Sequence, residues 1–127
     1  MDNQQKEVLI QNYLKAYNAF DIEGMLKDFD PDIKFKNISD KQVDLETYGL
    51  VTFKKQAELA AKLFASRKQI PLGYTHEGNK TTVPIYYEAV LAIDFPNGLK
   101  AGQKIELNGK SHFEFEGDKI IKLIDES

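Results

Sequence analysis

The chain of 127 residues is long enough for one domain, spanning residues 1–127, that buries a hydrophobic core of its own. Its formal net charge of −3 leaves no excess of cations to neutralise a phosphate backbone, so nucleic acid is not an expected partner. The absence of cysteine excludes disulfides, thiolate nucleophiles and cysteine metal sites.

Two helices are predicted at the start of the chain. Residues 3–19 form the first, because their apolar side chains recur at helical spacing in a single stripe: Leu9, Tyr13, Ala16, Tyr17 and Phe20. Asp21 is placed to cap a second, shorter helix, whose own apolar stripe ends at Phe29. Pro31 ends this helix, since the residue before a proline avoids helical geometry.

A short strand and a third helix are predicted next. In residues 32–37, "DIKFKN", apolar and lysine side chains alternate as in a half-buried strand. Residues 38–51 show no sustained period and are expected to form a long connection. Thr52 then caps a helix that runs to about Arg67.

From residue 70 onward the pattern has a period of two, which is typical of strands. One strand is expected around residues 70–76, a second over 81–95, a third over 103–116 and a last over 120–124, separated by the turns "EGNK", "PNG" and "EGDK". A bulge in "PIYYEAV" or near Gly109 would move the following side chains to the other face.

These elements predict an α+β domain. Three N-terminal helices pack on a curved, mostly antiparallel sheet. Long antiparallel strands coil, and a coiled sheet wrapped on helices leaves a conical pocket between the two layers. The apolar inner face of the predicted sheet and the stripe of the first helix would line this pocket.

The order of elements and three segments resemble the NTF2-like superfamily, a cystatin-like roll that includes ketosteroid isomerases and SnoaL-type polyketide cyclases. The segments are "YLKAYNAFDIEGMLKDFDPDIKF", "YGLVTFKKQAELAAKLF" and "SHFEFEGDKIIKL". In ketosteroid isomerases a tyrosine and a protonated acid bind the substrate oxygen while a carboxylate moves the proton. The resemblance places Tyr13 at the tyrosine, Asn37 at the proton-moving carboxylate and Ser111 at the protonated acid.

Few titratable side chains are expected inside the pocket. Tyr17 and Tyr87 are candidate ligand donors, and Tyr48 in the long connection is a candidate for the pocket mouth. His76 continues an apolar strand face and is the candidate acid or base. No third ligand accompanies the two histidines at metal spacing, so neither a metal nor another cofactor is expected.

Three functions are compatible with these residues. The favoured one is binding of a small apolar ligand without catalysis, because Asn37 and Ser111 stand where carboxylates would be. The second is an isomerase, lyase or cyclase that uses Tyr13 and His76 on an apolar carbonyl compound. The third is binding of a protein partner through the exposed sheet face. That face, around Tyr86 and Glu88, is also expected to pair two copies as a homodimer.

No apolar run approaches the roughly 18 residues of a membrane span. The first residues lack the basic and apolar regions of a signal peptide. We therefore expect a cytoplasmic protein without a membrane partner.

Overall fold

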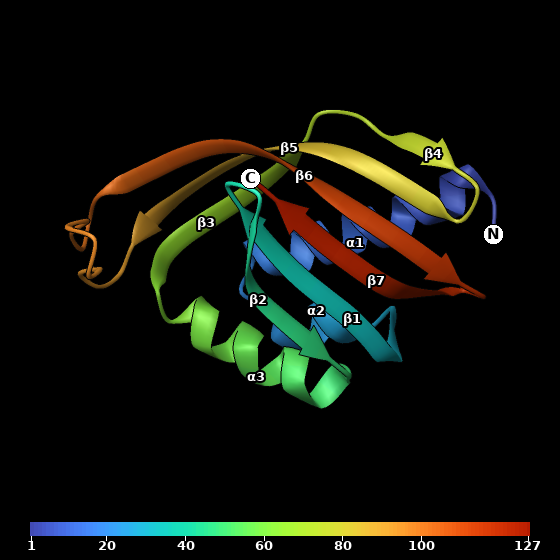
Figure 1. The fold of residues 1–127 in the computed structure, drawn as a ribbon, viewed down its shortest axis with the longest axis horizontal. Helices are drawn as coiled ribbons and strands as arrows, with labels where there is room; N and C mark the ends of the chain where they lie inside the picture. The colour runs from blue at the N-terminus through green and yellow to red at the C-terminus, as the bar shows by residue number, and fades with distance from the viewer.

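The computed structural model describes all residues, 1–127. Three helices and seven strands follow in the order α1 (Asn3–Asn18), α2 (Ile22–Leu26), β1 (Phe29–Ser39), β2 (Gln42–Tyr48), α3 (Leu50–Ala61), β3 (Phe64–Pro71), β4 (Thr75–Glu77), β5 (Lys80–Leu91), β6 (Lys104–Glu116) and β7 (Lys119–Glu126). The helices lie on one side of a single curved sheet (Figure 1). The predicted α+β fold with three helices on a curved, mostly antiparallel sheet is confirmed.

The strand order in the sheet is β2-β1-β7-β6-β5-β3, and β4 pairs with β5 beyond the end of β3. All neighbours are antiparallel except β1 and β7, which are parallel. The long strands β5 and β6, together with β3, curve away from the helices and form an arm that extends past them (Figure 1). The space between this arm, the β1–β2 hairpin and α3 is where a ligand site can form.

Both ends of α1 are held by local hydrogen bonds. Asp2 and Gln5 form a capping box, in which each side chain accepts a hydrogen bond from the other residue's backbone N–H, at 2.7 and 2.8 Å. At the other end Phe20 has a left-handed backbone with φ of 58°. Its N–H donates to the carbonyl of Tyr17 and the N–H of Asp21 donates to the carbonyl of Ala16, which is the Schellman arrangement. Asp21 then caps α2 as predicted, because its side chain accepts from the N–H of Gly24 at 3.0 Å.

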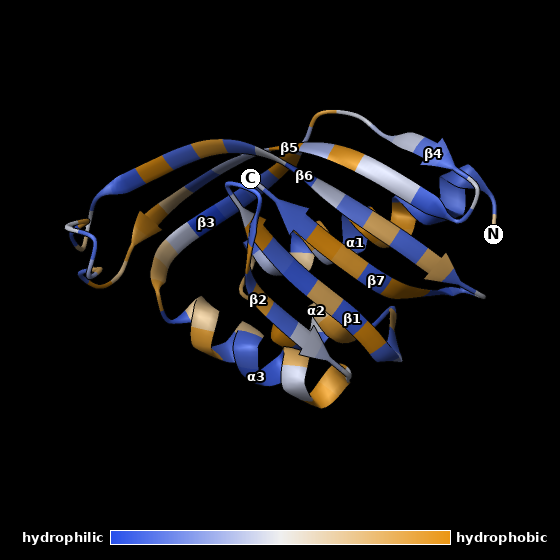
Figure 2. Ribbon diagram, viewed as in Figure 1, coloured by the Kyte–Doolittle hydropathy of each residue, from blue (hydrophilic) through white to orange (hydrophobic).

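The core lies between α1 and the concave face of the sheet. Alternating residues of β6 point inward, which gives the alternating colours along this strand in Figure 2. The least exposed core side chains come from α1, β1, β5, β6 and β7: Ile10, Ile33, Val83, Phe113, Ile120 and Leu123. Burial of such side chains is worth roughly 1.5–3 kcal/mol each and accounts for the inward orientation of the alternating apolar residues.

Several boundaries differ from the prediction. The second helix ends at Leu26, and β1 already begins at Phe29, before Pro31. The strand expected around residues 70–76 is divided between the end of β3 and β4.

The expected connection over 38–51 contains the end of β1 and the edge strand β2, which pair as a hairpin. The third helix begins at Leu50 after Gly49, whose φ is 85°, and ends at Ala61. The segment after it forms β3, because Arg67 and Gln69 pair with β5 rather than continuing the helix. None of the helices has the length and apolar character that a membrane crossing requires.

Candidate functional site

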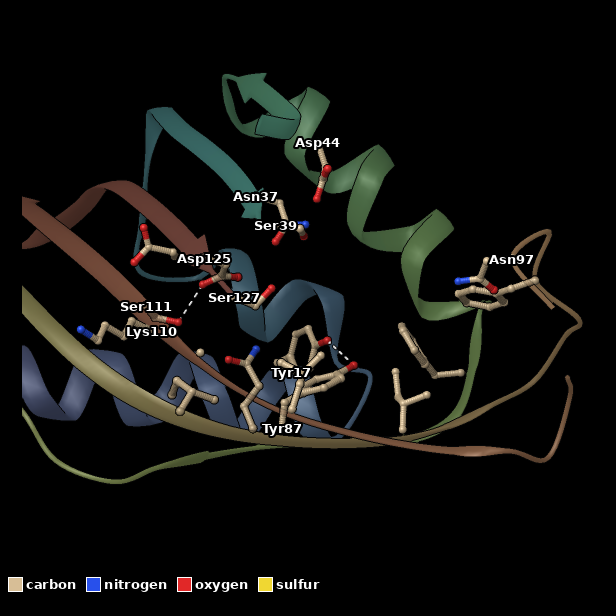
Figure 3. Close-up of a pocket in the computed structure, with 18 residues that line it drawn as sticks. Tyr17, Asn37, Ser39, Asp44, Tyr87, Asn97, Lys110, Ser111, Asp125 and Ser127 are labelled. Carbon is tan, nitrogen blue, oxygen red and sulfur yellow. Dashed lines mark hydrogen bonds between the residues drawn. The ribbon is translucent and has the colours of Figure 1, made fainter. Parts of the chain in front are cut away.

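An open cavity of about 640 Å³ lies between the β5–β6 arm and the end of the β1–β2 hairpin. Its wall combines apolar side chains from the arm with polar side chains from the strand ends (Figure 3). The residues that line it are Tyr17, Asn37, Ser39, Asp44, Phe64, Gln69, Ile85, Tyr87, Phe95, Asn97, Ile105, Leu107, Gly109, Lys110, Ser111, Asp125, Glu126 and Ser127. The volume falls within the range typical of small-molecule sites.

Asp125 on β7 is the one acid of the cavity lining that is not exposed, whereas the other two, Asp44 and Glu126, are exposed. It stands opposite Ser111 of β6 in the antiparallel register, and the Ser111 hydroxyl donates to Asp125 Oδ1 at 2.7 Å. Burial raises the pKa of the Asp125 carboxyl from 3.8 to about 6, while the hydrogen bond from Ser111 and the charge of His112 act in the opposite direction. The carboxyl is therefore mostly ionised at neutral pH. Because its pKa is raised, the carboxylate is a stronger base than that of an ordinary aspartate.

This carboxyl corrects the expectation that the interior has no acid. Asn37 and Ser111 are uncharged, as the sequence shows, but Asp125 lies directly beside both of them. The prediction ended the last strand at Ile124, whereas β7 continues to Glu126. Asp125 lies two residues after the fully buried Leu123, so its side chain is on the same side of the sheet as that of Leu123.

Tyr17 and Tyr87 form a pair of hydroxyl groups on the opposite side of the cavity. Their oxygen atoms are 3.0 Å apart, so one hydroxyl donates to the other (Figure 3). Burial raises the pKa of both phenols, which keeps them protonated at neutral pH. Only one of the two protons is used in this bond, and the other hydroxyl remains a donor for a ligand.

Uncharged polar side chains also line the cavity. Gln69 stands opposite Tyr87 in the register of β3 and β5, and its backbone is held by two hydrogen bonds with the Asn18 side chain, at 2.8 and 3.1 Å. Asn37 pairs with Asp125 across β1 and β7, just before an irregularity in the β1–β2 register. Its side chain and that of Ser39 point toward the same space (Figure 3).

The structure brings four of the seven predicted site residues to this cavity: Tyr17, Asn37, Tyr87 and Ser111. Tyr13 lies in the core, where it stacks on Phe29 at 5.2 Å and meets the edge of Phe113 at 6.0 Å. Burial raises the pKa of its phenol well above the usual value, and the negative charge of Asp125 raises it further. Tyr13 thus lies close to the acid without lining the cavity.

His76 and Tyr48 lie away from the cavity lining. His76 shares a hydrogen bond with Glu7 of α1 at 2.7 Å and another with Thr81 of β5 at 2.8 Å. Tyr48 is 60% exposed, and its hydroxyl donates to Glu46 on the same edge strand. The structure does not bring His76 and Tyr13 together at one cavity, and no cluster of three His, Asp or Glu side chains could hold a metal ion.

The sequence matches no family model and no curated protein. Solved structures match over nearly the whole chain. An NTF2-like protein from Burkholderia pseudomallei K96243 superposes with a TM-score of 0.78 at 14% identity, covering 98% of this chain and 90% of that one. The chain has the NTF2-like fold. The resemblance to the NTF2-like superfamily is therefore confirmed at the level of the fold.

The descriptions of two further matching structures mention a ligand or an activity. A candidate SnoaL-like polyketide cyclase from Jannaschia sp. CCS1 has a TM-score of 0.78 at 11% identity, with 96% of this chain and 84% of that chain covered. TerC, crystallised with polyporic acid, has a TM-score of 0.76 at 14% identity, with 95% and 89% covered. At these identities the similarity establishes the fold and leaves the chemistry to be argued from the cavity.

Proposed function

We propose that the cavity binds a small, largely apolar carbonyl compound and that Asp125 removes a proton from the carbon next to the carbonyl group. The Asp125 carboxyl in the cavity, with its raised pKa, carries this proposal. The reaction class is a proton transfer of the isomerase or cyclase type. Such chemistry uses only acid and base groups of the chain, so no cofactor is needed.

Asp125 has the properties that a general base requires. A base works best when its pKa lies near the operating pH, and a pKa of about 6 meets this condition better than that of an ordinary aspartate. Ser111 holds Oδ1 in place at 2.7 Å, which fixes the direction of the carboxyl. The second oxygen, Oδ2, makes no hydrogen bond within the chain and is the atom that would take the proton.

The Tyr17–Tyr87 pair supplies the complementary donor. When Asp125 takes the proton, negative charge develops on the carbonyl oxygen of the ligand, and a fixed hydroxyl donor lowers the energy of that state. The free proton of the pair serves this purpose because both phenols stay protonated. Gln69 and Asn37 are neutral donors and acceptors that orient the ligand without competing as bases.

The similar structures support a small-molecule ligand. One is described as a candidate polyketide cyclase and another was crystallised with polyporic acid. The apolar part of the wall, from Phe64, Phe95 and Ile105, suits the hydrocarbon portion of such a compound. Binding without turnover remains the second candidate function, and the neutral Asn37 beside the acid favours it because an amide orients a ligand but takes no proton.

We also propose that the convex face of the sheet pairs with a second copy of this chain. Partly buried apolar side chains occupy the middle of this face: Tyr86 and Ile124. Lys36 and Lys122 lie toward one end of the face, and Glu88 and Glu106 lie opposite one another toward the other end. A two-fold axis through the middle would place lysines against glutamates. Sedimentation of the native protein and of Tyr86→Arg tests this, and a native monomer would contradict it.

Hydrogen exchange of a small ketone tests the proposed chemistry. β-Tetralone is apolar and loses the proton next to its carbonyl group slowly enough for its exchange with deuterated water to be followed by NMR. The native protein is expected to accelerate this exchange, and Asp125→Asn to remove roughly 99% or more of the acceleration, as is usual for loss of a general base. Asp32→Asn, at an exposed acid of β1 outside the cavity lining, is the matched control and should keep it.

The result separates the two candidate functions. Exchange that depends on Asp125 supports the proton transfer. Binding of β-tetralone without accelerated exchange supports a binding protein without turnover. Both candidate functions are contradicted if the protein does not bind this ketone and the native mass spectrum shows no co-purified small molecule.

A further inference from the structure

Arg67 of β3 is a buried cation without a carboxylate partner. Its side chain is only 5% exposed, and none of the ion pairs of the chain includes it. Nε donates to the carbonyl oxygen of Tyr17 at 2.9 Å, and one terminal nitrogen lies 3.9 Å from the sulfur of Met25. Burying an arginine without an acid is costly, so these contacts must offset the loss of water.

Two aromatic rings cover the guanidinium group. Its central carbon lies 3.7 Å from the centre of the Tyr17 ring and 4.5 Å from the centre of the Phe20 ring. Phe20 reaches this position with a φ of 58°, at the helix end where glycine is preferred. The chain therefore accepts an unfavourable backbone conformation at Phe20 and places an aromatic ring there against the cation.

We propose that Arg67 is a positioning residue that acts through Tyr17: its cation behind the ring strengthens the Tyr17–Tyr87 hydroxyl pair as a donor to negatively charged oxygen. This inference rests on the proposed function, and it names the ligand state that the pair favours, an enolate or phenolate. A cation on the face of a phenol ring draws electron density from it and makes its hydroxyl proton a better donor.

The surrounding charges agree with this role. The charge of Arg67 lowers the pKa of Tyr13, Tyr17 and Tyr87, against the larger effect of burial, whereas the charge of Asp125 raises the pKa of Tyr13 and Tyr87. Asp125 and Arg67 thus have opposite effects on the pKa of Tyr13 and Tyr87. When a ligand gives its proton to Asp125, negative charge develops on the ligand oxygen. That oxygen would accept a hydrogen bond from the Tyr17–Tyr87 hydroxyl pair, which the charge of Arg67 makes a better donor.

A purely structural role explains only part of this arrangement. The bond from Nε to the Tyr17 carbonyl satisfies the last turn of α1, where a cation is favourable. Hydrogen bonding to that carbonyl does not require the second ring of Phe20 or the unusual backbone that positions it. The contacts with both rings instead hold the cation against Tyr17.

The pKa of bound β-naphthol tests the proposal, because its naphtholate form has a distinct absorbance and carries its charge on oxygen. In Arg67→Met the bound naphthol is expected to have a pKa about one unit higher than in the native protein, which corresponds to a tenfold loss of preference for the anion. Lys68→Met removes the same charge from the neighbouring exposed residue of β3 and should leave the value unchanged.

Phe20→Gly keeps the cation and suits the left-handed backbone, so it is expected to fold even where Arg67→Met does not. Removing the Phe20 ring from its place against the guanidinium group should raise the pKa of bound naphthol by a smaller amount. Equal values in the native protein and in the folded variants would overturn the role of Arg67 and leave the proposed function standing. Failure of the native protein to bind β-naphthol would overturn the role of Arg67, and the proposed function would fall with it only if Asp125 also gave no accelerated exchange of β-tetralone.

Discussion

Asp125 should make the folded protein less stable at neutral pH than it would be with a neutral side chain. Folding removes water from its carboxyl and provides one hydrogen bond from Ser111 but no ion pair. Burial raises the pKa from 3.8 to about 6, so the folded chain holds this proton more tightly than the unfolded chain does. At about 1.4 kcal/mol per pKa unit, the difference corresponds to roughly 3 kcal/mol.

The substitution Asp125→Asn removes the charge and keeps an oxygen that accepts from Ser111. Below about pH 4 both side chains are neutral, and the native protein and the variant should have similar stability. As the pH rises to about 6 the native protein loses its stabilising proton, and the loss is complete above that pH. At about pH 8 the variant should be the more stable by up to roughly 3 kcal/mol in the free energy of unfolding.

Urea unfolding followed by circular dichroism at both pH values measures this difference, since the midpoint and slope give the free energy of unfolding. Asp44→Asn is the control, because this acid is exposed at the cavity rim and should have little effect on stability at either pH. A variant at position 125 that is less stable than the native protein at about pH 8 would refute the reasoning. A difference that does not change with pH would refute it equally.

Three other substitutions test separate features of the site. Tyr87→Phe removes one hydroxyl of the pair with Tyr17 and should weaken β-naphthol binding about fivefold in calorimetry, the usual effect of one hydrogen bond. His76→Gln loses bonds to α1 and β5 and should lower the free energy of unfolding by roughly 1–3 kcal/mol, with unchanged β-naphthol affinity. Gly109→Ala would place a Cβ atom 2.5 Å from the carbonyl oxygen of Glu126 and should lower the melting temperature through displacement of β7.

The fold was predictable because most long segments carry one clear period. The alternation along β5 and the second half of β6 agrees with the buried positions in the structure. Of the predicted α1 stripe, Tyr13 and Ala16 are buried, whereas the most buried residues of this helix include Ile10 and Leu14, which the stripe left out.

The edge strand β2 was missed although Val43, Leu45 and Thr47 alternate with polar residues, because only Thr47 of the three is buried. An edge strand with one covered residue gives a weak hydropathy signal.

The site was less predictable than the fold because one extra residue in β7 decides which side chains face inward. Phe115 pairs with Ile120 and Glu114 pairs with Lys122, so Ile121 has no partner of its own. Alternation counted from the buried Ile120 would therefore place Asp125 on the convex face.

The extra residue at Ile121 forms a β-bulge and exchanges the two faces for the residues that follow it. Leu123 is accordingly fully buried although it comes three residues after Ile120, where regular alternation would bury a residue two or four positions later. A pattern read from the sequence assumes an unbroken pleat, and no hydropathy rule states where an extra residue is inserted. The placement of Asp125 in the cavity consequently depends on a pairing between β6 and β7 that is set by tertiary packing. Functional side chains are often placed by such local departures from regular structure, and Phe20 at the end of α1 is a second case in this chain.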